Sequence, residues 1–171
     1  MKNFLHYLAM ALILSSLVSC GGGGGGTTGV SLPANVTLKI NLTGALPAST
    51  AISGVDFTVT LPANVTPALT NGSITTGVVS NSGTFSGSTF PPMVFYTAPT
   101  PGVPGKLKVT LTSSIPTGVT QVGEVATITL QLTNAPVPTV GSFGLTAVSV
   151  YDASVVGPIN GMGAIVASVS P

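Results

Sequence analysis

The sequence predicts an all-β protein, with a two-sheet antiparallel β-sandwich of the jelly-roll type and about nine strands. Apolar and polar residues alternate with a period of two in several runs rich in Val, Ile and Thr, which indicates half-buried strands. Clusters of Gly, Pro, Asn and Ser separate these runs and are typical of tight turns. No amphipathic helical pattern follows the N-terminal segment. The sandwich is expected to span residues 30–171.

The first strands are expected at 35–43 and 54–61. The runs NVTLKINL and GVDFTVTL place an apolar residue at every second position, with Thr, Lys, Asn or Asp between them. One face of each strand should therefore lie in the core and the other in water. Three short strands, at 73–79, 84–90 and 93–97, should follow between the turn sequences NGS and NSG and the proline-rich segment TAPTPGVPG.

Four further strands are expected, at 106–113, 123–133, 143–151 and 161–169. The runs GKLKVTLTS and EVATITLQL show the same alternation most strictly. Their pattern predicts that Val109, Ile128 and Leu130 are core residues. The opposite positions, such as Thr110 and Thr127, should point outward.

The N-terminus has the pattern of an export signal. Lys2 is followed by the mostly apolar run FLHYLAMALILSSLV, from Phe4 to Val18. This run is too short and ends too abruptly for a comfortable membrane span, whereas its length suits a signal peptide. An uncleaved N-terminal anchor helix is the alternative.

The sequence LVSC, which ends at Cys20, resembles the lipobox of bacterial lipoproteins. The resemblance implies that the signal, residues 1–19, is removed, and that Cys20 carries diacylglycerol and an acylated N-terminus. Cys20 is the chain's 1 cysteine, so it has no disulfide partner within the chain, and no histidine lies close enough in sequence to share a metal. Gly21 follows it in place of the aspartate associated with inner-membrane retention. We therefore expect a cell-envelope protein, on the outer membrane where the organism has one.

Residues 20–29 are expected to be a tether. A glycine-rich tract behaves as a flexible coil, and this one should span roughly 15–20 Å. It does not have the pattern of a phosphate-binding loop, because no strand precedes it and no Lys-Ser or Lys-Thr pair follows it.

Charged residues are scarce after the signal. They are three lysines and three carboxylates: Lys39, Lys106, Lys108, Asp56, Glu124 and Asp152. Three lysines cannot form the basic patch that nucleic acid requires. No histidine is left to activate a serine, and each carboxylate is explained by a place on a strand or in a turn. We therefore expect no catalytic residues, metal or cofactor, although a calcium site built around Asp152 and backbone carbonyls stays open.

Four segments resemble parts of the cohesin family. They are ISGVDFTVTLPANV, GKLKVTLTSS, GEVATITLQL and VSVYDASVVGPINGMGAIV, and the third is the best match. The resemblance implies a jelly roll that recognises a dockerin-like protein over one sheet face. Related carbohydrate-binding modules share this plan, so a polysaccharide partner is the other implication. The acidic residue common in the turn after the second strand is missing here, where the turn reads Leu61-Pro62-Ala63-Asn64.

Two sets of residues are candidates for binding. The segment FSGSTFPPMVFY is rich in aromatic residues, and Phe90 and Tyr96 are the candidates for stacking on sugar rings. Alternatively, alternate members of this segment simply fill the core. Thr110 and Thr127 are the candidates for a protein-binding sheet face. A passive structural component of the cell surface, with no dedicated ligand, is the remaining alternative.

Overall fold

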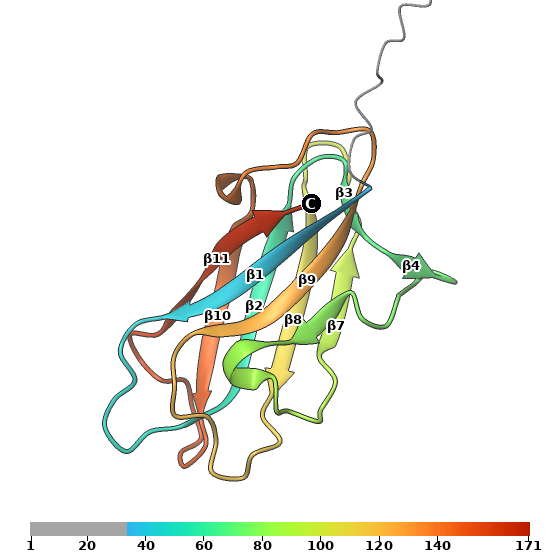
Figure 1. The fold of residues 1–171 in the computed structure, drawn as a ribbon. Coiled ribbons are helices and arrows are strands. Elements are labelled where there is room, and N and C mark those ends of the chain that lie inside the picture. The colour runs from blue at the N-terminus through green and yellow to red at the C-terminus, as the bar shows by residue number, and fades with distance from the viewer. Residues whose placement is uncertain (1–33) are drawn as a thin grey trace, which may run out of the picture. The chain divides into compact units, whose positions relative to one another are not determined.

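Two antiparallel sheets form a β-sandwich in the computed structural model, which describes residues 34–171 (Figure 1). The predicted fold class is therefore confirmed. Sheet A has the strand order β11-β1-β9-β3, with β6 also pairing with β9, and sheet B has the order β10-β2-β8-β7. The signal predicted at 1–19 and the tether predicted at 20–29, including Cys20, lie outside the described residues.

The strand bounds are as follows. Sheet A consists of β1 (Asn35–Thr43), β3 (Val65–Pro67), β6 (Val79–Asn81), β9 (Glu124–Leu132) and β11 (Gly163–Ser170). Sheet B consists of β2 (Ile52–Leu61), β7 (Met93–Thr97), β8 (Gly105–Thr112) and β10 (Gly144–Asp152). A small hairpin, β4 (Leu69–Thr70) with β5 (Ser73–Ile74), and the 3-10 turns η1 (Gly83–Phe85) and η2 (Val140–Ser142) complete the described chain.

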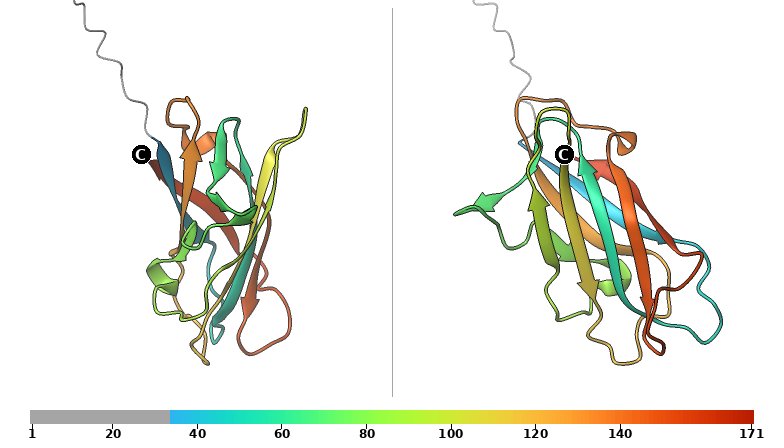
Figure 2. Two further views of the ribbon diagram at one scale, coloured as in Figure 1. Left: turned by 90° about the vertical axis from the view of Figure 1, so that its right-hand side faces the viewer. Right: turned by 180° about the vertical axis from the view of Figure 1, so that it is seen from behind.

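The chain passes repeatedly from one sheet to the other. It crosses between β1 and β2, between β2 and β3, between β6 and β7, and at each connection from β8 to β11, as in jelly-roll folds. Figure 2 shows the two layers edge-on and, in its second view, sheet B in front with β7 at one edge. Each sheet therefore has one face in the core and one outer face.

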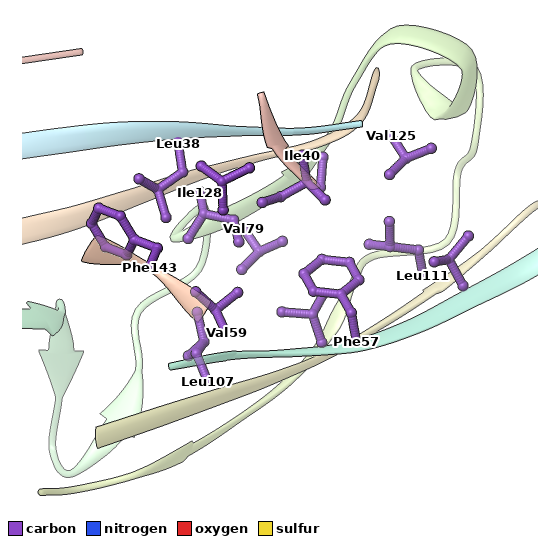
Figure 3. Packing of buried hydrophobic residues seen from close by; sticks show 14 of the residues in the cluster. Leu38, Ile40, Phe57, Val59, Val79, Leu107, Leu111, Val125, Ile128 and Phe143 are labelled. Atoms are coloured by element: carbon purple, nitrogen blue, oxygen red, sulfur yellow. The ribbon is translucent and has the colours of Figure 1, made fainter. Parts of the chain in front are cut away.

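The core lies between the two sheets and follows the alternation of the sequence (Figure 3). Leu38 and Ile40 of sheet A pack toward Phe57 of sheet B, and all are almost fully buried. The predicted core residues Val109, Ile128 and Leu130 are each 0% exposed, so that prediction is confirmed. Burial of one such side chain contributes about 1.5–3 kcal/mol. Among residues 34–171 no polar or charged side chain is fully buried.

Two predicted strands are wrong. Residues 73–79 are divided between β5 and β6, because Gly77 adopts a left-handed φ of 90° that interrupts the extended chain. Residues 84–90 form η1 and irregular chain instead of a strand. Gly83 turns the chain there with a φ of 51°, and a Cβ at this position would collide with the backbone of Glu124. Phe85, at 1% exposure, then enters the core from the turn.

The short strands β3 and β4 were not predicted. Pro67 ends β3 on an edge of sheet A, where a missing N–H is tolerated. The β4–β5 hairpin turns at Asn71 and Gly72, which have φ values of 52° and 80°. Two successive positive φ values are typical of the two-residue hairpin turn that an Asn-Gly pair favours. The part of sheet A that faces β7 is thus assembled from short pieces.

Candidate binding surface

The outer face of sheet B, here called face B, carries a mixture of polar, charged and apolar side chains. It consists of outward residues from four strands: Thr146, Ser149 and Tyr151 of β10, Asp56, Thr58 and Thr60 of β2, Lys106, Lys108, Thr110 and Thr112 of β8, and Met93, Phe95 and Thr97 of β7. The strand register aligns them in rows. One row runs Ser149–Asp56–Thr110–Met93, and the next runs Thr146–Thr58–Lys108–Phe95. Neighbours in a row have Cβ atoms about 5 Å apart.

The β7 edge of face B is apolar. Met93 is 57% exposed and Phe95 is 59% exposed, because their strand positions point away from the core. Phe90, in the loop before β7, is also exposed, and the side-chain Nδ2 of Asn81 donates a hydrogen bond of 2.9 Å to its carbonyl oxygen. Three large apolar side chains thus lie in solvent within a few residues of one another along the chain.

Charged groups lie beside this apolar edge. Lys106 and Lys108 project from β8, and neither forms an ion pair within residues 34–171. Asp56, two strands from β7, accepts a hydrogen bond of 3.2 Å at Oδ2 from the Tyr151 hydroxyl. Its other oxygen, Oδ1, is buried without a hydrogen-bond partner in the described chain. Face B therefore offers two available ammonium groups and a carboxylate held in place by a tyrosine.

The outer face of sheet A, here called face A, differs in composition. Its outward side chains are mainly hydroxyls and amides, with one large apolar residue, Ile165, which is 50% exposed beside Asn41. The polar members are Thr37, Asn41, Ser80, Thr127, Thr129, Gln131 and Ser168. Lys39 and Glu124 form an ion pair, with Nζ and Oε2 2.9 Å apart. The hydrogen bond from Lys39 holds the pKa of the Glu124 carboxyl below its usual range. The charges of this pair are consequently neutralised within the face.

The structure separates the predicted site residues. Thr110 lies on face B and Thr127 on face A, so the two threonines cannot belong to one binding surface. Phe90 is exposed, as its proposed role requires.

Tyr96 is not the exposed ring that was expected. It points inward from β7, where it is half-buried against the core, and burial raises the pKa of its hydroxyl. Phe95, which the sequence analysis did not select, is the outward ring of that strand. The alternation within MVFYT could have identified Phe95, because Val94 and Tyr96 lie on one side of the strand and Phe95 lies on the other.

The described residues hold no group of three or more His, Cys, Asp or Glu side chains that could bind a metal ion. Asp152, around which a calcium site was considered, accepts hydrogen bonds of 2.9 Å from both the N–H and the hydroxyl of Ser154. The hydrogen bond from the Ser154 N–H is the main reason that the pKa of the Asp152 carboxyl is lowered. Asp152 therefore has a structural role in closing its turn.

Surface hollows are shallow. One of about 310 Å³ lies between the β2–β3 turn and the β7–β8 hairpin, lined by prolines and small residues without a charged group. In the part of the chain that is described, no helix has the length and apolar character needed to cross a membrane.

No protein-family model, no curated protein and no solved structure matches the chain.

Proposed function

We propose that the protein is a lipid-anchored, non-catalytic binding protein of the cell envelope that docks a protein partner on face B. The observation that supports this most directly is the asymmetry of the two outer faces. Face B has exposed Met93 and Phe95 beside lysines that form no ion pair within residues 34–171. On face A the exposed large apolar residue is Ile165 alone among the described residues, and the charges pair with each other. Methionine and aromatic side chains are enriched at the centres of protein interfaces.

The charge of face B indicates the chemistry of the partner. Lys106 and Lys108 outnumber Asp56, whose carboxylate is already bonded by Tyr151. A partner that presents acidic groups next to an apolar side chain would be complementary to this face. The cohesin-like segments are consistent with a protein recognised over one sheet face.

The proposed anchor explains how such a face is presented. Acylated Cys20 would hold the chain in the membrane, and the glycine tract would let the sandwich reorient toward its partner. The Cys20→Ala variant should keep its signal and lack lipid, as shown by intact mass. A wild-type chain that carries no lipid mass on Cys20 would overturn this part of the proposal.

Site-specific photo-crosslinking tests the assignment to face B. A photoreactive phenylalanine derivative is placed at Thr110 on face B or, as the matched control, at Thr127 on face A. We expect Thr110 to give a discrete adduct with another envelope protein and Thr127 to give little. Equal adducts from both positions, or none from Thr110, would contradict the proposal, and the latter result would favour a passive structural role.

A polysaccharide partner is the second candidate, favoured by two exposed rings, Phe90 and Phe95, in a hydroxyl-rich surface. A sugar ring can stack only on an aromatic side chain that is exposed to solvent. In affinity electrophoresis with envelope polysaccharide, retardation should be lost in Phe90→Ala and Phe95→Ala. It should persist in Tyr96→Phe, since that ring points inward. Unretarded wild-type protein would exclude this candidate.

A further inference from the structure

Two asparagines of the chain directly precede a glycine, Asn71 and Asn160. Asparagine is a chemically labile residue, because the backbone nitrogen of the next residue can attack the carbonyl carbon of its side chain. A side chain on that next residue hinders the attack, whereas glycine has none. Both asparagines are exposed. They are therefore the two positions of the described chain at which the sequence favours spontaneous modification most.

The backbone angle ψ of the asparagine decides whether the attack can occur. The attacking nitrogen must lie beside the asparagine Cβ, which happens when ψ is about −120°, the value of the first central residue of a type II′ turn. That residue of a type II′ turn also has a positive φ. When φ is negative, the same ψ falls outside the main allowed regions of the backbone. An asparagine with a positive φ is thus better placed to react.

Asn71 already has a positive φ. It is the first central residue of the β4–β5 hairpin turn, with a φ of 52°, and Gly72 follows with a φ of 80°. Two positive values are typical of a type I′ turn, which differs from type II′ mainly in the orientation of the peptide between its central residues. Rotation of that peptide changes ψ of Asn71 and φ of Gly72, and glycine accepts either sign of φ. The hairpin turn is therefore one peptide rotation from the geometry of attack.

The surroundings of the hairpin turn leave this rotation free. A Cβ placed on Gly72 would meet nothing within 4 Å, and no backbone hydrogen bond holds the Gly72 N–H within residues 34–171. Strands β4 and β5 form a separate two-stranded sheet, and Figure 1 shows β4 projecting from the side of the sandwich. The peptide can consequently rotate without disturbing sheet A or sheet B.

Asn160 lies in a turn that is held on both sides. Its φ is not positive, so a ψ suited to attack is strained there. The preceding Ile159 is buried, and its N–H donates a hydrogen bond of 2.6 Å to the carbonyl oxygen of Val150. Gly161 lies so close to Gly44 that a Cβ on Gly44 would collide with the Gly161 carbonyl oxygen. The folded structure therefore opposes the rotation at Asn160.

We propose that Asn71 is a site of spontaneous modification, converted to aspartate and isoaspartate in the folded protein much faster than Asn160. The Gly72 nitrogen forms a bond to Cγ of Asn71 and loses its proton to solvent base. The bond from Cγ to Nδ2 breaks, and Nδ2 takes up a proton and leaves as ammonia. Water then adds to one of the two carbonyls of the resulting succinimide ring. Cleavage of the bond from that carbonyl to the ring nitrogen yields either aspartate or isoaspartate.

The modification changes both the charge and the shape of the hairpin. Lysines and carboxylates balance within residues 34–171, so one new carboxylate makes this part of the chain acidic. Isoaspartate also inserts a carbon atom into the backbone of a turn whose length fixes the register of the hairpin. β5 lies against β7, and Ile74 of β5 lines a hollow together with Pro91 and Val94. The surface beside β7 should therefore change as the protein ages, whatever partner face B binds.

Peptide mapping of the folded full chain tests the proposal. The protein is incubated at mildly alkaline pH, which favours loss of the proton from the attacking nitrogen. Mass spectrometry then follows the exchange of NH₂ for OH at each asparagine. We expect Asn71 to react at least about tenfold faster than Asn160, a ratio that one sparsely populated backbone conformation can impose. Both aspartate and isoaspartate should form. Equal rates at the two positions, or no reaction at Asn71, would overturn the proposal.

Two controls separate the effect of the turn from that of the sequence. In urea the two rates should become similar, because both asparagines then face an unrestrained glycine nitrogen. A preference for Asn71 that persists unchanged in urea would contradict the role of the turn. Gly72→Ala should slow the reaction at Asn71, since its methyl group shields the nitrogen, and leave the rate at Asn160 unchanged. An unchanged rate at Asn71 in this variant would exclude attack by the nitrogen of residue 72.

Discussion

Faces A and B are built from strands with the same alternation and cover opposite sides of one core, yet their outward residues differ in kind. Face A has mainly hydroxyl and amide side chains, one exposed isoleucine (Ile165) and one internally neutralised ion pair. Face B has two lysines without ion-pair partners in the described chain, an aspartate bonded to a tyrosine, and an apolar edge. Inward positions are constrained by packing, whereas outward positions are free to specialise. We therefore propose that the difference between the faces determines where a partner binds.

The largest expected effect is on stability, and it should be the same for the two sheets, because their inner faces share one core. Leu111 of sheet B and Leu130 of sheet A are both 0% exposed. Truncation of either leucine to alanine should cost about 2–5 kcal/mol of unfolding free energy, because each leaves a cavity in the shared core. Urea unfolding followed by circular dichroism measures both. A cost below 1 kcal/mol at either position would show that the two inner faces are not equivalent.

Binding should then distinguish the outer faces. Thr110→Glu places a charge at the centre of face B, between Asp56 and Met93 in its row, and should weaken partner binding by at least about tenfold, or 1.4 kcal/mol. The matched variant Thr127→Glu on face A should bind as wild type. Binding is measured with the partner identified by the Thr110 photo-adduct. A reversed order of the two variants would assign the site to face A.

A smaller effect concerns the bond between Asp56 and Tyr151. Tyr151→Phe removes the hydroxyl donor and should cost about 1 kcal/mol or less, the usual net contribution of an intramolecular hydrogen bond. The cost should appear in urea unfolding at neutral pH, with the core unchanged. Greater stability of Tyr151→Phe would mean that the hydroxyl does not stabilise face B.

The smallest effect is on face A and depends on pH. The pKa of Glu124 is lowered by Lys39, so the pair stabilises the fold above the carboxyl's ordinary pKa of 4.5 and this contribution disappears as pH falls through the lowered value. Because the pair is partly exposed, the contribution should be about 0.5 kcal/mol. Unfolding at pH 7 and pH 3 should show a smaller difference for Glu124→Gln than for wild type. Asp152→Asn serves as a comparison, since the pKa of the Asp152 carboxyl is also lowered.

The sequence by itself determined which long segments are strands and which of their residues are buried. The strands β1, β2, β8 and β9 lie close to their predicted bounds, and Val109, Ile128 and Leu130 are core. A half-buried strand must alternate, so the pattern of period two carries this information locally. Prediction was less successful between β2 and β7, where Gly77 and Gly83 divide the chain into pieces too short to show a period.

The tertiary structure alone decided which strands share a sheet. Thr110 and Thr127 have the same local signature, an outward threonine between apolar neighbours, and they lie on opposite faces of the molecule. Alternation specifies an inner and an outer side for each strand, but not the partner strand or the layer. For the same reason the lysines and apolar side chains of face B emerge only when distant segments are brought into register.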